Sequence, residues 1–228
     1  MDAEDFQKGQ LILIDKPLEW TSFQVVNKLR WTIRKKYKLK KIKVGHAGTL
    51  DPLATGLLII CTGKFTKIIN KIQAKKKEYT GTITLGASTP SYDLETEINQ
   101  TFPITNISDA DIQKTAKLFL GEIEQTPPLY SAIKKDGIRL YELARKGEST
   151  VIQSRKISIY EFEIIKIDMP NIAFRVVCSK GTYIRSLAND FGKALNSGAH
   201  LSSLRRTKSG DYLVENAIDP LHYVDMLD

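Results

Sequence analysis

The segment from Gly45 to Gly63, GHAGTLDPLATGLLIICTG, constrains this chain more than any other, because it joins a tight turn to a long apolar run. Three glycines and one proline fall within its first twelve residues, a composition that neither a helix nor a continuous strand accommodates. The backbone must therefore form a specific loop there. The apolar residues from Leu57 to Cys61 are expected to form the buried strand that anchors this loop.

Asp51 lies inside the loop, directly before Pro52. An isolated Asp-Pro pair most often marks a turn in which the aspartate bonds to nearby backbone. A carboxylate held on a rigid turn can also act as a nucleophile. The choice between these two interpretations depends on the rest of the chain.

Other short motifs accompany the loop over roughly residues 10 to 215. They are Leu13–Pro17 with Thr21–Ser22, the string GHAGTLDPLATG, Lys77–Tyr79, Thr89–Asp93, Gly181–Arg185 and Leu204–Thr207. In this order they resemble the TruB family of pseudouridine synthases, which modify uridine 55 in the T loop of tRNA. The resemblance implies the pseudouridine synthase fold, an α/β (α+β) fold with a mixed, largely antiparallel central sheet flanked by helices and loops. It also implies tRNA pseudouridine(55) synthase activity, an isomerase reaction.

The resemblance implies three catalytic residues, Asp51, Tyr79 and Arg185. Tyr79 would stack on the flipped uracil, and the guanidinium of Arg185 would keep Asp51 ionised. On pattern alone, Tyr79 is a core strand residue and Arg185 a surface helix residue, so both roles depend on the resemblance. Asp51 would either attack C6 of the uracil or take a proton from C2′, and the sequence leaves both routes open.

Further positions match the substrate-binding and supporting residues of the family. Tyr183 and Leu204 match residues that line the uridine pocket, and His46 matches a residue that packs within the T loop where the flipped bases were. Supporting roles are expected for Lys16, Pro17 and Asp93.

The charge of the chain is consistent with a polyanionic partner. Lys and Arg number 34 against 26 Asp and Glu, which gives a formal charge of +8. The cations gather in two clusters, Arg30, Arg34, Lys35, Lys36, Lys38, Lys40, Lys41 and Lys43, and then Lys75, Lys76 and Lys77. Taken alone, each cluster is explained equally well by a solvated helix end or loop as by contact with a polyanion. Their positions before the Asp51 loop and before Tyr79 favour contacts to phosphates.

Residues 125–147 interrupt the regular pattern and are expected to form a long loop or arm. Prolines and glycines bracket a polar stretch with interleaved aromatic and basic residues, which are Tyr130, Lys134, Lys135, Arg139, Tyr141 and Arg145. Such a mixture suits RNA, because rings stack on bases and cations meet phosphates. A packed connection with core tyrosines is the alternative. In the resembling family, the matching segment is a mobile thumb that closes on the T loop.

Local signals predict several elements. Alternation predicts a strand from Tyr79 to Leu85 and a hairpin whose two strands join around 168–171. Ser22 is expected to cap one helix, and Ser108 with Asp111 to open another that ends at Gly121. A further helix is expected from Thr182 to about Leu195.

We expect a single catalytic domain over residues 1–228, without room for the C-terminal RNA-binding (PUA-like) domain that many family members carry. The reaction needs no cofactor. The two cysteines and three histidines lack the spacing of a metal site, and Cys61 and Cys178 are expected to be buried. The expected partner is the T arm of tRNA, with no membrane contact and no obligate protein partner. We expect a monomeric, cytoplasmic enzyme.

Three other functions are weighed against this one. The chain could be a non-catalytic tRNA-binding or tRNA-folding module, although Asp51, Tyr79 and Arg185 are all present. It could be a guide-dependent pseudouridine synthase acting on other RNA, a type that usually carries an added C-terminal domain. A glycosidase is a more distant alternative, because hydrolysis normally needs paired carboxylates and only Asp51 is convincingly positioned.

Overall fold

A computed structural model describes residues 2–135, 137–148 and 150–227, and the chain divides into two compact units. The first unit combines Met1–Tyr79 with Leu204–Asp228, and the second is the intervening segment Thr80–Ser203. Strands β4 (Lys77–Leu85) and β12 (Ala199–Ser209) each run from one unit into the other. Within the described residues, no helix has the length and apolar character needed to cross a bilayer.

The sheet of the first unit is built around β3 (Ala54–Thr62). β3 pairs antiparallel with β1 (Leu11–Lys16) and β2 (Val44–His46), and parallel with β12 at Leu204–Arg206, while the short β13 (Tyr212–Leu213) extends β12. Nearly every residue of β3 is buried, which explains why its apolar run is continuous rather than alternating. The predicted strand after the Asp51 loop is therefore confirmed.

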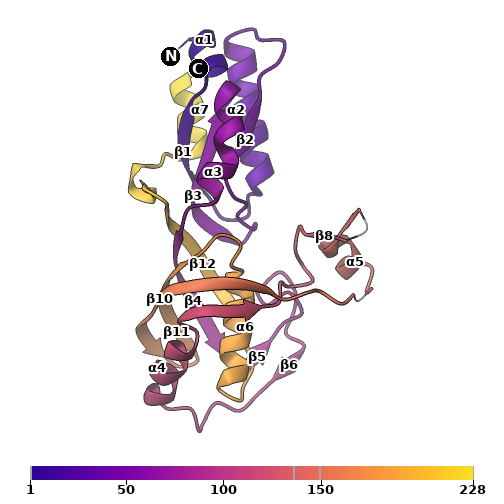
Figure 1. Ribbon diagram of the computed structural model, residues 1–228, viewed down its shortest axis with the longest axis vertical. Coiled ribbons are helices and arrows are strands. Elements are labelled where there is room, and N and C mark those ends of the chain that lie inside the picture. Colours follow the sequence, from indigo (N-terminus) through magenta and orange to yellow (C-terminus); the bar gives the residue numbers. More distant parts are fainter. Residues whose placement is uncertain (1, 136, 149, 228) are drawn as a thin grey trace. The chain divides into compact units, whose positions relative to one another are not determined.

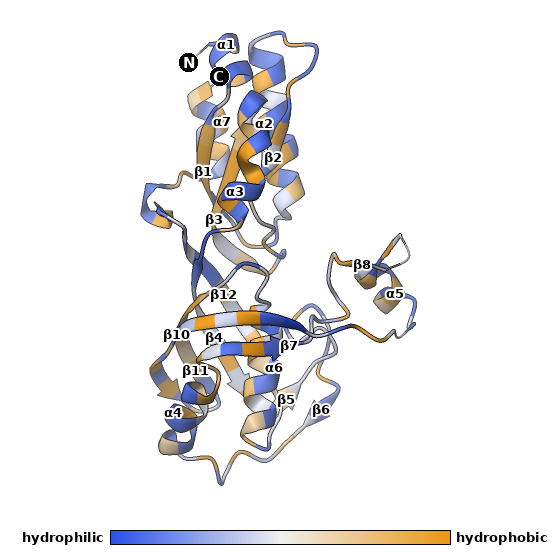
Figure 2. Cartoon of the chain, in the orientation of Figure 1, coloured by the Kyte–Doolittle hydropathy of each residue, from blue (hydrophilic) through white to orange (hydrophobic). Residues whose placement is uncertain are grey.

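The helices of the first unit cover this sheet (Figure 1). They are α1 (Ala3–Lys8), α2 (Ser22–Lys36), η1 (Gly63–Ile68), α3 (Ile69–Gln73), η2 (Val214–Asn216) and α7 (Pro220–Leu227). α7 packs against both α2 and β1. Figure 2 shows the apolar β1 and β3 beside helices that carry both hydrophilic and hydrophobic residues. The predicted cap of α2 is wrong by one residue: Thr21 forms the capping box with Gln24, and Ser22 is already helical.

In the second unit the strands follow the order β4, β11 (Asn171–Cys178), β10 (Arg155–Asp168) and β7 (Gly121–Gln125). β10 and β11 form the predicted antiparallel hairpin, with Asp168 opposite Asn171. Helices α4 (Asp109–Leu118) and α6 (Ile184–Ala194) pack with these strands, and β5 (Ala87–Ser88) pairs with β6 (Gln100–Thr101). Both cysteines are buried, as predicted.

One cluster of aromatic rings and one capping box stabilise the helices of the second unit. Phe162 lies within 6.3 Å of the rings of Phe119, Phe174 and Phe191, measured between centroids, so α4, α6 and the hairpin share one aromatic core. The predicted capping box of Ser108 with Asp111 is present. The predicted end of α4 at Gly121 is wrong, because the helix stops at Leu118 and Gly121 begins β7.

Residues 125–147 contain more secondary structure than the predicted long loop. After β7 the chain forms β8 (Lys134–Lys135), β9 (Ile138–Arg139) and α5 (Leu140–Arg145). The guanidinium groups of Arg139 and Arg145 lie 5.8 and 5.4 Å from the ring centre of Tyr141. Three of the interleaved aromatic and basic residues of this arm therefore stack on one another.

Candidate active site

Arg206 holds the loop on the N-terminal side of Asp51. Its side chain is buried, and it donates hydrogen bonds to the carbonyl oxygens of Leu57 at 2.7 Å, Gly48 at 3.0 Å and Thr49 at 3.4 Å. A guanidinium carries five N–H donors in one plane, so a single residue can bind carbonyls of both the strand and the loop. The loop is thereby fixed to β3.

Lys16 holds the other side of the loop. Its fully buried ammonium donates to the carbonyl oxygens of Trp20 at 2.5 Å, Pro17 at 2.9 Å and Pro52 at 3.3 Å. Burial lowers the pKa of Lys16 to about 8, and the positive charge of Arg206 adds to this effect, while the negative charge of Asp51 opposes it. Lys16 and Asp51 therefore interact electrostatically within the first unit.

The middle of the loop is bound by Ser22 and by its own backbone. The Ser22 hydroxyl accepts the N–H of Leu50 at 2.8 Å and also donates to the Leu50 carbonyl at 3.0 Å. The Asp51 carbonyl accepts the N–H of Ala54 at 3.1 Å. Each carbonyl from position 48 to position 52 thus has a protein donor, and the partly buried Asp51 belongs to a loop held by hydrogen bonds along its length.

The remaining expected site residues of the first unit lie on strands. His46, on β2, pairs with Ile60 of β3. Burial lowers the pKa of His46, and the positive charge of Arg206 lowers it further, whereas a hydrogen bond with the Gly48 backbone raises it. His46 is therefore neutral near pH 7. Tyr79 is buried on β4, and the partly buried Leu204 lies opposite Ala54, where β12 meets the end of the loop.

Arg205 precedes Arg206 on β12 and serves a different part of the unit. Its guanidinium binds the carboxylate of Asp15 at two points, 2.9 and 2.6 Å long, and both side chains are partly exposed. Neighbouring strand residues point to opposite faces. Arg206 therefore faces the Asp51 loop, while Arg205 joins β12 to β1.

Arg185 and Asp93 come together in the second unit. Arg185 lies in the first turn of α6, is buried, and donates to the carbonyl oxygens of Ser91 at 3.1 Å and Tyr130 at 2.9 Å. Its Nε lies 3.5 Å from a carboxylate oxygen of the equally buried Asp93. The other oxygen of Asp93 accepts the N–H of Glu95 at 3.0 Å. Arg185 thus links the Asp93 turn to the start of the 125–147 arm.

Tyr183, the N-cap residue of α6, is held through its backbone. The buried side-chain amide of Gln125 accepts the Tyr183 N–H at 2.8 Å and donates to the Tyr183 carbonyl at 3.0 Å. The guanidinium of Arg155 lies 4.8 Å from the centre of the Tyr183 ring and donates to the carbonyl of Gly181. The ring is therefore presented in a defined orientation on the second unit.

Sequence reasoning missed Arg206, Gln125 and Arg155, and assigned Lys77 incorrectly. Lys77 was expected among the phosphate contacts, but it is buried and donates to the carbonyl oxygens of Lys75, at 2.6 Å, and Gln73. A lysine that serves backbone carbonyls inside the protein is not a surface cation. Arg206 lay within a quoted motif, and strand alternation would have distinguished it from Arg205.

Comparisons with known proteins extend over the whole chain. The model of the "TruB family pseudouridylate synthase (N terminal domain)" matches residues 34–184, and that of the "tRNA pseudouridylate synthase B C-terminal domain" matches residues 185–227. Relatives named tRNA pseudouridine synthase B include one from Flavobacterium johnsoniae, 67% identical over 96% of both chains. Another, from Bacteroides fragilis, is 52% identical over 98% of this chain and 96% of its own length.

Solved structures support the predicted fold. A chain in the crystal structure of a Cbf5–Nop10–Gar1 complex superposes with a TM-score of 0.72 at 33% identity, covering 99% of this chain and 56% of that one. This chain therefore spans little more than half of that structural relative. The expected mixed, mostly antiparallel fold is confirmed, and the chain belongs to the TruB family of pseudouridylate synthases.

Proposed function

We propose that this chain converts uridine 55 in the T loop of tRNA into pseudouridine. Membership of the TruB family supports the reaction, and relatives named tRNA pseudouridine synthase B, aligned over nearly their full length, support tRNA as the substrate. The structural observation that carries the proposal is the loop of Asp51. Its carbonyls are bound by Arg206, Ser22 and Lys16, and Asp51 itself is only partly buried.

The isomerisation breaks the bond between C1′ and N1, rotates the uracil and joins C5 to C1′. N1 gains a proton and C5 loses one, so atoms and electrons balance without a redox cofactor. Asp51 assists either by attacking C6 or by taking the C2′ proton as the glycosidic bond breaks. A primary isotope effect from deuterium at C2′ in single-turnover reactions would identify the second route.

The other site residues are assigned roles on the RNA substrate or in support of the two units. Tyr79 stacks on the flipped base, and Tyr183 and Leu204 each contact the bound uridine. His46, neutral near pH 7, packs within the T loop where the flipped bases were. Lys16 supports the loop through backbone carbonyls, including that of Pro17. Asp93 holds Arg185, which we assign as the arginine partner of Asp51 during the reaction.

The proposal is tested with an unmodified tRNA transcript, the purified protein, a chelator and no other component. We expect pseudouridine at position 55 by chemical labelling, and none with Asp51→Asn, which should still bind tRNA within a few-fold because binding rests on phosphates and stacking. Binding without product would indicate the non-catalytic alternative. Product that requires an added guide RNA or protein would contradict a cytoplasmic enzyme that acts as a monomer on tRNA.

A further inference from the structure

The long segment between Glu19 and Glu78 carries an extreme charge bias. It contains fifteen Lys and Arg residues and a single acidic residue, Asp51. The second unit is different, because several of its surface cations pair with carboxylates, as in Lys156–Glu122, Lys166–Asp168 and Arg175–Glu161. The excess positive charge of the protein is therefore concentrated on the first unit.

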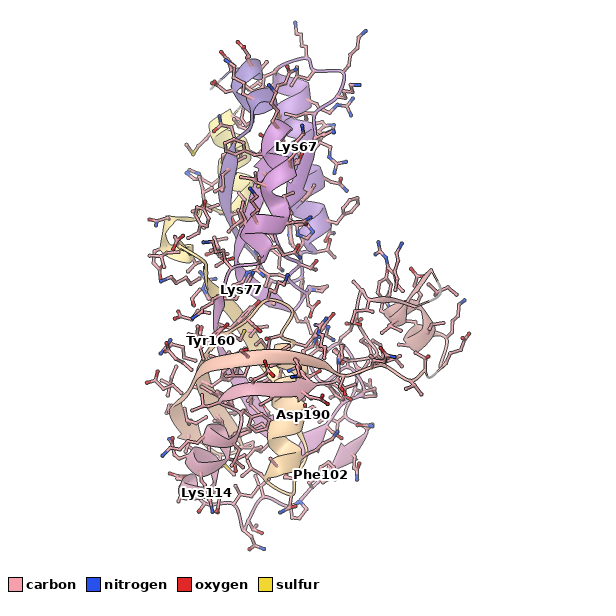
Figure 3. All side chains as sticks on the ribbon, in the orientation of Figure 1. Lys67, Lys77, Phe102, Lys114, Tyr160 and Asp190 are labelled. Carbon is pink, nitrogen blue, oxygen red and sulfur yellow. The ribbon has the colours of Figure 1, made fainter. Side chains whose placement is uncertain are left out.

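Seven of these cations lie close together in sequence at and just after the C-terminal end of α2, and we call them the basic ridge. The ridge consists of Arg34, Lys35, Lys36, Lys38, Lys40, Lys41 and Lys43, all exposed. Among the residues that the structure describes, no carboxylate forms an ion pair with them. Figure 3 shows long side chains ending in nitrogen that project from the segment after α2. An unpaired basic surface of this size suits a polyanion.

The ridge is an ordered part of the first unit rather than a loose tail. Apolar side chains alternate with its lysines and are partly buried: Tyr37, Leu39, Ile42 and Val44. The ring of Tyr37 packs 5.5 Å from that of the fully buried Phe6, measured between centroids. The lysines are thus presented outwards by a segment anchored to the core, which reduces the entropy lost when they bind a ligand.

Aromatic residues join the ridge to the Asp51 loop along the exposed side of α2. Phe23 is 62% exposed and Trp31 58% exposed, and the Lys35 ammonium lies 4.9 Å from the Trp31 ring centre. Ser22, at the start of the helix, bonds to Leu50 beside Asp51. Because a helix rises 1.5 Å per residue, the ridge begins about 20 Å from the loop along α2.

We infer that the basic ridge and Trp31 bind the RNA backbone of the tRNA substrate outside the reacting T loop. The inference rests on the proposed function for the identity of the RNA. About 20 Å far exceeds the reach of one nucleotide, so the flipped uridine and the ridge contact different parts of the same molecule. Cations meet phosphates, and the exposed indole offers a surface for a ribose or an unpaired base.

The first test neutralises four lysines together, as K38Q/K40Q/K41Q/K43Q, in the Asp51→Asn background so that no product forms. Affinity for full-length tRNA is measured between 50 and 200 mM KCl. We expect at least a tenfold loss of affinity and a salt slope reduced by about 0.9 per lost phosphate contact. The control is K114Q/K117Q, two exposed lysines of α4, which should match the parent. Equal loss in both variants, or no loss in the ridge variant, would overturn the inference.

The second test keeps Asp51 and measures single-turnover pseudouridine formation with the same four ridge substitutions at saturating tRNA. A rate within twofold of wild type is expected, because the ridge binds RNA but does not touch the reacting atoms. A lost rate at saturation would refute a purely binding role. Absence of product from the wild-type protein would contradict the proposed function instead, and the salt measurement would still decide the ridge.

Trp31 supplies an independent signal. The only other tryptophan is Trp20, so Trp20→Phe leaves Trp31 as the single indole reporter. Addition of tRNA should change its emission with the same midpoint as the binding curve. Unchanged emission at saturation, or a change produced by anionic lipid vesicles but not by tRNA, would overturn the assignment.

Discussion

The Arg206 guanidinium donates to the carbonyl oxygen of Gly48 at 3.0 Å, and 158 positions of sequence separate the two residues. The same side chain binds Thr49 and Leu57, so one cation from the C-terminal part of the chain determines the shape of the loop that carries Asp51. A group that acts on a reacting atom must be placed to within about 0.5 Å. Arg206 is therefore a positioning residue for Asp51.

Arg206→Lys should lower the single-turnover rate by about 100-fold, because an ammonium cannot bind three carbonyls in the plane of a guanidinium, and misplacement by about 1 Å costs that much. Affinity for tRNA should change by less than about threefold, since the surface cations are untouched. Arg205→Lys is the matched control, because the guanidinium of Arg205 binds the carboxylate of Asp15 instead of the loop. Equal rates in the two variants would remove the positioning role.

Lys16 should give the reaction an alkaline limit near pH 8. Its pKa is lowered to about 8, so the ammonium that donates to three carbonyls becomes a neutral amine with only two hydrogens as pH rises through that value. Single-turnover rates measured from pH 6 to 10 should therefore decline above about 8. In Lys16→Arg the decline should move to higher pH, because a guanidinium does not titrate there. The same midpoint in both proteins would assign the decline to another group.

The contribution of Lys16 to stability should increase with pH, whereas activity should decrease. The unfolded chain keeps the Lys16 proton up to about 10.5, while the folded protein releases it near 8. Between these values the unfolded state binds more protons, so the contribution of Lys16 to the free energy of unfolding grows with pH. The measurement is urea unfolding of wild type and Lys16→Met at pH 7.5 and 9.5. Their stability difference should shift in favour of the wild type at the higher pH.

Arg185→Lys should severely reduce activity although the charge is kept. The guanidinium binds the carbonyls of Ser91 and Tyr130 and lies beside the Asp93 carboxylate, and a lysine cannot reach all three. We expect the rate to fall by at least about 100-fold, measured in single turnover. Arg175→Lys, whose partners are exposed glutamates, is the control and should behave as wild type.

Gly56→Ala should destabilise the protein more than Gly48→Ala. Both glycines have positive φ, +99° and +117°, so both substitutions incur backbone strain of about 1–2 kcal/mol. A methyl at position 56 would lie 2.4 Å from the carbonyl oxygen of Arg206, whereas one at position 48 would meet only an ordinary contact at 3.6 Å. Urea unfolding should therefore show an additional cost of at least about 2 kcal/mol for Gly56→Ala. Equal costs would mean that β3 and β12 can separate locally.

Helices, strands and caps that depend on nearby residues were mostly predicted from the sequence. Contacts between residues far apart in the sequence could not be predicted from it. The capping box of Ser108 and the hairpin turn at 168–171 depend on residues a few positions apart, and both are present. Ser22 was assigned to a cap because its partner Leu50 lies 28 positions away and is invisible to a local pattern. The carboxylate of Asp51 was found from its motif, but the groups that shape its loop were found only from the fold.

The roles of Tyr79, Tyr183, Leu204 and His46 remain predictions from the family resemblance. Tyr79 lies on a predicted strand, whereas Tyr183 caps α6 instead of lying within its first turn. The strands that carry His46 and Leu204 were not predicted. The burial of Lys77 was misjudged from its sequence. It was expected to be a surface cation, yet its ammonium donates to backbone carbonyl oxygens inside the protein.

The first unit is built from the N-terminal and C-terminal parts of the chain, so its active-site loop can form only late in synthesis. Thr80–Ser203 is contiguous and can fold as it leaves the ribosome, whereas β3 waits for its parallel neighbour β12, which is synthesised about 150 residues later. Until Arg206 has emerged, the Asp51 loop has no donor for Gly48, Thr49 or Leu57. A nascent chain arrested before Arg206 should therefore carry every proposed catalytic residue and still be unable to modify RNA.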